Sequence, residues 1–363
     1  MNKRIACLGY GALTPVGATA AETFSAARDG RSALRLHEGT FGCKEPFTGS
    51  LFEDRMPLEG CAFFDTLAIR AAAQAIGMAG IDPASARVAF VLSSIKGNVE
   101  AIGREDVSLA VSAERLSRHF GNPNRPLVVS NACISGLAAL VQGRRMLLSG
   151  AWDYVVVVGA EVQSRFIVTG FQSLKALSLA PCKPFSADRD GLNLGEAAAA
   201  MVLGVSDTGW ELADGAIRND ANHISGPSRT GEGSYNALRY VLNGVDPKEL
   251  SFVNVHGTST LYNDEMESIA IARAGLLDVP VNGLKGCFGH TMGAAGVLES
   301  ILSMLACEAG TVLPTRGFTT LGVSEAVKVS AAPGVCRGDA FVKLLSGFGG
   351  VNGALLFRKG GAR

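Results

Sequence analysis

Residues 128–136, with the sequence VVSNACISG, decide the fold. An apolar strand ending at Ser130 is followed at once by a helix of small residues, so the chain turns sharply around Cys133. The turn places the Cys133 thiol at a helix N-terminus, where free backbone N–H groups and the helix dipole favour an anion. We therefore expect a nucleophilic thiol with a lowered pKa, although a single cysteine is more often a buried structural residue.

Short apolar runs alternate with helix-like segments along the whole chain, which indicates an α/β protein with buried strands. Strands are expected at Arg4–Gly9, Arg87–Leu92, Leu127–Ser130, Tyr154–Gly159, Ala197–Gly204, Phe252–Val255, Ala340–Leu345 and Gly353–Phe357. Helices are expected at Ala20–Asp29, Phe64–Ala79, Ser135–Ser149, Asn263–Arg273 and Gly293–Ala309.

The two halves of the chain have the same layout. In the first half, a strand leads to Cys133 and a helix of small residues; in the second, Val281–Gly283 leads to His290 and a similar helix. A hairpin-like pair of strands follows each helix. This pattern predicts an internal duplication, and a stretch rich in Gly, Ser and Asn suggests a division into residues 1–218 and 219–363.

Composition excludes several classes of protein. Of the 363 residues, 47% are hydrophobic and only 18% are charged, with 33 basic and 33 acidic side chains, so a large core is expected and a nucleic-acid binder is not. The eight cysteines include no CxxC pair, which argues against a zinc site and for a reducing compartment. No apolar stretch is long enough to predict a membrane span.

Two histidines occupy positions that suit an active site. His256 directly follows Phe252–Val255 and precedes Gly257, so its imidazole is expected at a strand tip, where α/β proteins gather their active sites. His290 lies in residues 285–296, KGCFGHTMGAAG, before a helix whose small residues allow close packing. A histidine taken singly is more often a hydrogen-bonded structural residue, but this chain has only five.

A charged pair and a glycine turn complete the candidate site. Lys285 and Glu299 stand in apolar surroundings, and because buried charges need partners, we expect them to pair unless both are solvated. Residues 347–350, GFGG, lie between two expected strands, and their backbone N–H groups could serve an oxyanion hole. Taken alone, this segment is a glycine turn.

In this order, the segments resemble the β-ketoacyl synthase family of the thiolase-like superfamily over nearly the whole chain. The motifs that carry the resemblance are GYGALTPVG (9–17), the segment around Cys133, KPF (183–185), DRDG (188–191), His256-Gly257-Thr258, the segment 285–299 and the glycine turn. Each motif is weak alone, whereas the ordered series is highly specific.

The resemblance implies a thiolase-like fold in which two duplicated βαβαβαββ halves form a five-layer α-β-α-β-α core. It implies a condensing enzyme that needs no cofactor and no metal. Cys133 would be acylated from a carrier thioester, and a malonyl thioester would lose CO2 and attack the acyl-enzyme. The product would be a 3-oxoacyl thioester of fatty-acid or polyketide type. His256 and His290 would stabilise the enolate.

Supporting roles also follow from the resemblance. Lys285 and Glu299 match an ion pair expected to orient His290. The N–H groups of Cys133 and Phe348 would form the oxyanion hole. Phe348 would gate the acyl pocket within the turn formed by Gly347, Phe348, Gly349 and Gly350. The implied partners are an acyl carrier protein and a second copy or ketosynthase-like subunit, and the implied location is the cytoplasm.

The chain departs from the family pattern in three places. The stretch before Cys133 is short, Ser259 stands where the family usually has glycine, and Leu344-Leu345-Ser346 replaces Asn-Ser-Phe before the glycine turn. Two other functions therefore stay open. One is an accessory subunit like a chain length factor, although such subunits usually lack the nucleophile. The other is a repurposed acyltransferase, although simple acyl transfer needs only one base.

Overall fold

The computed structural model describes residues 3–104 and 107–360. Its helices are α1 (Ala20–Arg28), α2 (Phe63–Ala79), α3 (Leu109–His119), α4 (Ser135–Leu148), α5 (Arg165–Ser173), α6 (Glu232–Val241), α7 (Leu261–Arg273), α8 (Lys285–Phe288) and α9 (Ala295–Glu308). Short 3-10 helices lie at Thr40–Gly42 (η1), Val99–Ala101 (η2), Pro247–Glu249 (η3) and Met292–Ala294 (η4).

Eleven strands of the described residues form one large mixed sheet. They are β1 (Ile5–Leu13), β4 (Val88–Ser93), β5 (Leu127–Val129), β6 (Tyr154–Glu161), β8 (Ala197–Val205), β9 (Trp210–Asn219), β10 (Leu250–Asn254), β11 (Pro280–Asn282), β13 (Lys328–Val329), β15 (Ala340–Gly347) and β16 (Val351–Lys359). Two small sheets contain β2 (Arg35–His37), β3 (Phe47–Ser50) and β7 (Leu194–Gly195), and β12 (Thr311–Val312) with β14 (Gly334–Val335).

Strand order shows the duplication. The large sheet runs β13-β11-β10-β15-β16-β9-β1-β8-β6-β4-β5. Read outward from the β9–β1 junction, one half is β1-β8-β6-β4-β5 and the other is β9-β16-β15-β10-β11. In both, the first three strands pair antiparallel and the last two join them in parallel. The predicted duplication is therefore confirmed. The division at residues 218/219 stays a prediction, since strand order defines repeats and not independent domains.

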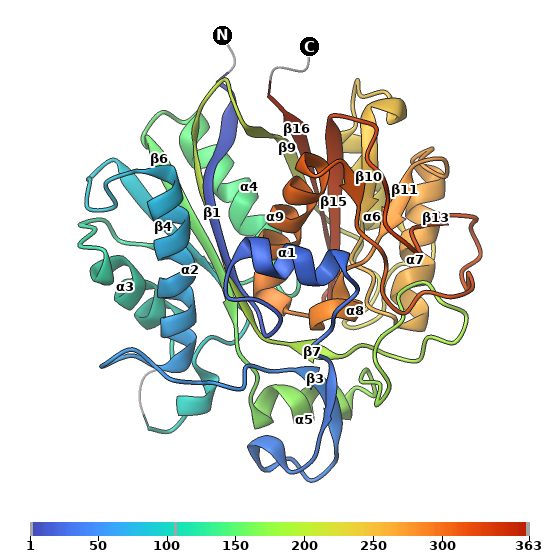
Figure 1. Ribbon diagram of the computed structural model, residues 1–363, viewed down its shortest axis with the longest axis horizontal. Coiled ribbons are helices and arrows are strands. Elements are labelled where there is room, and N and C mark those ends of the chain that lie inside the picture. The colour runs from blue at the N-terminus through green and yellow to red at the C-terminus, as the bar shows by residue number, and fades with distance from the viewer. Residues whose placement is uncertain (1–2, 105–106, 361–363) are drawn as a thin grey trace.

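The sheet halves and the helices form five layers. In Figure 1, α2 and α3 cover the outside of one half of the sheet and α6 and α7 cover the outside of the other, while α4 and α9 lie between the two halves. Within the large sheet, the two halves meet at a short antiparallel contact between β1 and β9, at Ala6–Glu211 and Cys7–Trp210. The predicted thiolase-like architecture is thus confirmed.

The middle layer explains why the chain is rich in small residues. In α4 and α9, Gly136 and Gly296 face each other, and a Cβ on Gly136 would lie 2.8 Å from the carbonyl oxygen of Gly293. Strands of the sheet are buried on both faces, as the AAAAMVL run of Ala197–Leu203 requires. Backbones can approach this closely only without side chains between them. The close approach brings the N-termini of α4 and α9 together.

The eight expected strands and five expected helices are all present, with bounds that differ by a few residues at most. The sequence did not predict β9, α3, α5 or α6. Strand β9 was missed because polar and glycine residues interrupt it, and several of its side chains are only half-buried. No helix of the described residues is long and apolar enough to cross a bilayer.

Candidate active site

Cys133 lies on a tight turn between β5 and α4. Ala132, directly before it, has φ 46°, a conformation that L-residues rarely adopt. Ser135 fixes this turn from both sides: its hydroxyl oxygen accepts the Asn131 N–H at 2.8 Å and its O–H donates to the Ala132 carbonyl at 2.6 Å. The strained turn aims the Cys133 side chain away from the strand and towards the second half of the molecule.

The thiol of Cys133 is neutral at neutral pH, contrary to expectation. Burial raises the pKa of Cys133 to about 11, and Lys285 and the N–H groups of Phe348 and Cys133 lower it only in part. The prediction of a lowered pKa was wrong because the side chain is only 6% exposed and desolvation outweighs the favourable charges. Its reaction as a nucleophile therefore needs a base to remove the proton.

His256 follows β10 and is held by its own backbone. Its N–H donates to Glu267 Oε1 at 2.6 Å, and the next N–H, from Gly257, donates to Glu267 Oε2 at 2.8 Å. Glu267 lies on α7 and is fully buried. A carboxylate that accepts two consecutive N–H groups fixes the peptide that carries the imidazole.

His290 lies between α8 and α9, and its backbone is hydrogen-bonded to the first half of the chain. Its N–H donates to the Asn193 carbonyl at 2.7 Å, and its carbonyl oxygen accepts the Gly195 N–H at 3.0 Å. The Met292 N–H donates to Nδ1 of His290 at 3.3 Å. Because Nδ1 accepts this hydrogen bond, the ring proton of neutral His290 resides on Nε2.

Cys133, His256 and His290 come together. One atom of each, the Cys133 sulfur and a ring nitrogen of each histidine, lies within 4.8 Å of the others. The two imidazoles meet edge to face, with centroids 5.0 Å apart. All three side chains line one cavity of about 460 Å³. Nδ1 of His256 and Nε2 of His290 are buried and have no hydrogen-bond partner among the described residues.

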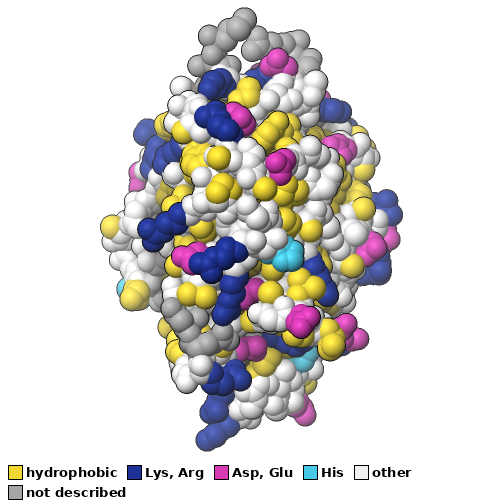
Figure 2. Space-filling model, turned by 90° about the vertical axis from the view of Figure 1, so that its left-hand side faces the viewer, with side chains coloured by type: hydrophobic (Ala, Val, Ile, Leu, Met, Phe, Trp, Pro, Cys, Tyr) yellow, Lys and Arg dark blue, Asp and Glu magenta, His cyan; other side chains and the backbone are white. Residues whose placement is uncertain are grey.

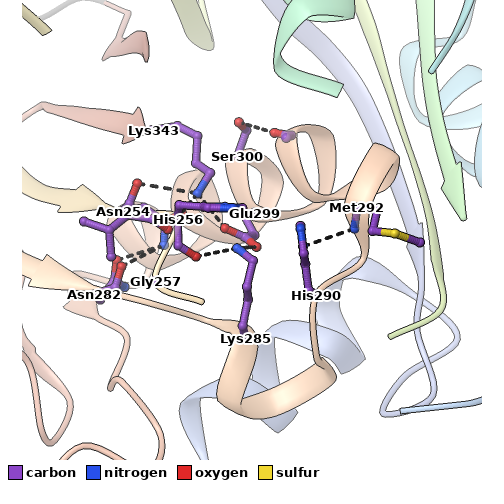
Figure 3. Close-up of polar contacts among 12 residues, drawn as sticks. Asn254, His256, Gly257, Asn282, Lys285, His290, Met292, Glu299, Ser300 and Lys343 are labelled. Atoms are coloured by element: carbon purple, nitrogen blue, oxygen red, sulfur yellow. Dashed lines mark hydrogen bonds and ion pairs between the residues drawn. The ribbon is translucent and has the colours of Figure 1, made fainter. Parts of the chain in front are cut away.

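A buried cluster of charges lies behind the histidines (Figure 3). Lys285 pairs with Glu299 at 2.9 Å, as expected, and its Nζ also donates to the carbonyl oxygen of His256 at 2.5 Å. Lys343 pairs with the other Glu299 oxygen at 2.5 Å. All three charged side chains are at most 1% exposed. The polar contacts of Lys285 thus reach the backbone of His256, and its expected role in orienting His290 stays a prediction.

Burial and the neighbouring cluster both lower the pKa values of the two imidazoles. Burial lowers the pKa of His256 well below its usual value, and the charges of Lys285, His290 and Lys343 lower it further. Burial, Lys285 and Lys343 likewise hold the pKa of His290 well below its usual value. A neutral imidazole can donate from one nitrogen and accept at the other. The site therefore offers two neutral rings beside one neutral thiol.

The glycine turn between β15 and β16 lies against the nucleophile. A Cβ on Gly347 would lie 3.0 Å from the Cys133 nitrogen, so only glycine lets this strand end approach so closely. Gly349 and Gly350 have φ 87° and 74°, which fold the turn back on itself. As a result the Phe348 N–H points to the Cys133 sulfur. The Phe348 ring, 36% exposed, stacks on Phe171 of α5 with centroids 5.9 Å apart.

Sequence reasoning missed two charged residues of this site. Lys343 interrupts the apolar run Phe341–Leu345, and a charge inside a buried strand is a signal that could have found it. Glu267 gave no such signal, because it lies three residues after Asp264 on an ordinary-looking polar helix start. Its contact with His256 depends on the tertiary placement of α7.

Cysteine and histidine are also ligands that zinc prefers, so the Cys133, His256 and His290 cluster is geometrically able to hold a metal ion. A metal on the sulfur would block its acylation. Activity measured with and without a chelator therefore distinguishes a catalytic cluster from a metal-binding one.

Known proteins share the sequence and the fold. Models of the N-terminal and C-terminal domains of β-ketoacyl synthases match residues 2–207 and 210–319. The chain is 28% identical to 3-oxoacyl-[acyl-carrier-protein] synthase 2 of Vibrio cholerae, over 99% of both proteins. It is 30% identical to a putative mitochondrial 3-oxoacyl-[acyl-carrier-protein] synthase of Schizosaccharomyces pombe, over 70% of this chain and 66% of that protein.

Among solved structures, a ketosynthase in complex with its chain length factor from Xenorhabdus doucetiae has the same fold. The TM-score is 0.87 at 24% identity, over 98% of both chains. The matched domain models cover most of the chain and include Cys133, His256 and His290. The chain therefore belongs to the β-ketoacyl synthase family and is a condensing enzyme, a decarboxylating acyltransferase.

Proposed function

We propose that Cys133 carries the acyl group and that His256 and His290 act on a malonyl thioester bound beside it. The observation that carries this proposal is the convergence of one sulfur and two imidazole nitrogens within 4.8 Å in a single cavity. In the first half-reaction, the thiol attacks the acyl thioester of a carrier protein and a neutral imidazole accepts its proton. The bond from the acyl carbon to the carrier sulfur breaks, the imidazolium returns the proton to that sulfur, and the acyl group stays on Cys133.

In the second half-reaction, the malonyl thioester loses CO2 and leaves an enolate. Neutral Nε2–H of His290 is a hydrogen-bond donor for the enolate oxygen, and a protonated nitrogen of His256 is the second. The enolate carbon attacks the carbonyl carbon of the acyl group on Cys133. The oxyanion that forms accepts hydrogen bonds from the backbone N–H groups of Cys133 and Phe348. The C–S bond then breaks, the thiolate takes up a proton, and the 3-oxoacyl group leaves on the carrier. Each such donor contributes on the order of 3 kcal/mol to the transition state.

The supporting groups have positioning roles in this proposal. Lys285 and Glu299 fix the backbone of His256 through the Lys285 contact to its carbonyl oxygen. The turn of Gly347, Phe348, Gly349 and Gly350 presents an N–H to the sulfur and places the Phe348 ring at the cavity. Movement of this ring away from Phe171 would open the space next to Cys133, which is the gating role proposed for Phe348.

A partner subunit is part of the proposal. Strand β5 is the last strand of the sheet, and its Leu127 is 38% exposed. Figure 2 shows the side of the molecule that carries α2 and α3, where hydrophobic side chains are exposed between Lys and Arg side chains. An open edge with apolar side chains favours strand pairing between chains. We propose that this edge pairs with a second copy or with a ketosynthase-like subunit.

The proposed setting is the cytoplasm, with an acyl carrier protein as the source of both thioesters. Eight free cysteines fit a reducing compartment. Fatty-acid and polyketide chains are both within the proposal, since the cavity beside Cys133 is lined by apolar and polar side chains alike.

The test is acyl loading followed by decarboxylation. Incubation with an acyl carrier thioester should add one acyl group to the intact protein by mass spectrometry, and Cys133→Ala should abolish this addition. Malonyl carrier should then release CO2 and yield a 3-oxoacyl thioester, unaffected by a chelator. Loading without CO2 release would identify an acyltransferase of another kind, and neither activity would identify an accessory subunit. Loss of activity in chelator would point to a metal on the three groups.

A further inference from the structure

Lys343 is a second buried lysine behind the active site, on β15, which pairs with β10 in the sheet. Its side chain is fully buried, and its neighbours Val342 and Leu344 are apolar and fully buried as well. Strands β15 and β10 pair in parallel, with Lys343 opposite Asn254. A buried ammonium group is costly unless its hydrogen bonds are satisfied. The partners of Lys343 therefore indicate what it does.

These partners lie on the segment that carries His256. The Nζ of Lys343 donates to the Val255 carbonyl at 3.0 Å and reaches the Asn254 carbonyl at 3.5 Å. Lys285 donates to the next carbonyl along, that of His256. Two ammonium groups thus hold three consecutive carbonyl oxygens, at the point where the strand ends and the imidazole begins (Figure 3).

Glu299 couples the two lysines. One of its oxygens accepts from Lys285 at 2.9 Å and the other from Lys343 at 2.5 Å. On the opposite side of the same peptide, Glu267 accepts the His256 N–H. The main chain at His256 is therefore held by buried ionisable side chains at both its carbonyl and its N–H.

We propose that Lys343 is a positioning residue for His256, acting with Lys285 through the carbonyl oxygens of residues 254–256. The inference deepens the proposed function, because it assigns to Lys343 the placement of a ring that holds the enolate. Lys343 directly precedes Leu344-Leu345-Ser346, the tripeptide in which the chain departs from the family pattern.

The lysine also acts on the charge of the ring. The charged and titratable groups around His256 are Lys285, Lys343, Glu299, Glu267, His290 and Cys133. Removal of Lys343 takes one positive charge from this set and leaves both carboxylates. An imidazolium then becomes less unfavourable, so the pKa of His256 rises, although burial and Lys285, the larger causes, still hold it below its usual value.

The experiment compares Lys343→Met and Lys343→Gln with the wild type, and uses Lys328→Met as the matched control. Lys328 pairs with Asp278 on the surface, so its removal deletes one ammonium far from the site. Two readouts are taken: the pH titration of His256 by NMR of histidine-labelled protein, and CO2 release from malonyl carrier. Acyl loading of Cys133 is measured in parallel.

We expect Lys343→Met to lower kcat for CO2 release by about 10- to 100-fold, with little change in KM, because a small displacement of a reacting group has this cost. The acid limb of the pH profile should move to higher pH together with the NMR titration of His256. Lys343→Gln keeps a donor for the Val255 carbonyl, so it should recover part of kcat while the titration stays shifted. Loading of Cys133 should fall as well, because His256 is the ring that accepts the thiol proton.

Two outcomes overturn the inference: a His256 titration identical in Lys343→Gln and Lys328→Met, or a kcat for CO2 release that is the same in Lys343→Met as in Lys328→Met. The NMR titration needs no activity. If wild-type protein released no CO2, the proposed function would fail, while the titration would still decide the effect of Lys343 on His256.

Discussion

Cys133 and His290 occupy equivalent places in the two halves of the molecule. Each follows the third strand of its repeat, β5 or β11, and each comes shortly before a central helix, α4 or α9. Both turns contain a non-glycine residue with positive φ, 46° at Ala132 and 42° at Met292. The duplicated fold thus contains the same kind of turn twice, and the two turns carry different side chains, a thiol and an imidazole.

The surroundings of the two groups act on their charge in different ways. At Cys133, burial raises the pKa of the thiol, Lys285 opposes this, and the buried acid Glu161 adds to it as a minor cause. At His290, burial and the charges of Lys285 and Lys343 all lower the pKa of the imidazole. An ammonium group favours a thiolate but disfavours an imidazolium. The comparison teaches that burial keeps the thiol neutral against the pull of Lys285, whereas burial and the lysines together keep the imidazole neutral.

The largest expected effect on activity comes from removing an imidazole of the second half. His256→Ala and His290→Ala should each reduce CO2 release from malonyl carrier by about 10²- to 10³-fold, because each removes one donor for the enolate oxygen. Acyl loading of Cys133 should fall far less in His290→Ala, since His256 still accepts the thiol proton, whereas His256→Ala should slow both steps because Nδ1 of His290 already accepts the Met292 N–H. Intact-mass kinetics and CO2 release measure the two steps separately.

His119→Ala is the matched control, because His119 lies at the end of α3 and is absent from the residues that line the cavity. It should leave both steps unchanged. An equal loss of loading and CO2 release in His290→Ala would contradict the division of labour between the halves.

The sequence predicted the parts of this comparison that depend on local pattern. A strand, a turn and a small-residue helix can be recognised within about fifteen residues, so Cys133, His256 and His290 could be named before the fold was known. The Lys285–Glu299 pair followed from two charges in apolar company.

The parts that depend on tertiary packing were missed or wrong. The thiol pKa was predicted to be low from the helix N-terminus alone, whereas burial under the glycine turn and the second half raises it. Glu267 on α7 and Lys343 on β15 lie 11 and 87 residues after His256 in the sequence. Both hold the backbone of the segment that carries His256. Only the parallel pairing of β10 with β15 brings Lys343 to that peptide.

A smaller effect, on stability, is expected where α4 of the first half packs on α9 of the second. Gly296→Ala should lower the free energy of unfolding by about 1–3 kcal/mol, because the new methyl group meets the backbone at Leu137 in α4 and must displace one helix. Urea denaturation followed by circular dichroism measures the change.

Gly77→Ala tests the same substitution in helix α2, where the added carbon meets nothing within 4 Å. It should raise the free energy of unfolding by about 0.4–1 kcal/mol, since alanine has fewer conformations to lose on folding. If both variants had the same stability, close packing of α4 on α9 would not be what holds the two catalytic turns together.

The smallest expected effect is in the pH profile of CO2 release. It tests whether the two imidazoles are neutral in the resting protein. Their pKa values are lowered below 6.5, so the neutral form persists as the pH falls through 6.5 and is lost only further down. CO2 release at about pH 6 should stay close to its neutral-pH rate, whereas an imidazole with an ordinary pKa would be only about one quarter neutral there. The measurement is the rate of CO2 release at saturating malonyl carrier between about pH 5 and pH 8. A midpoint near 6.5 would show that neither burial nor the buried lysines lower the pKa values of the histidines, and the contrast between the two halves would then be one of side-chain identity alone.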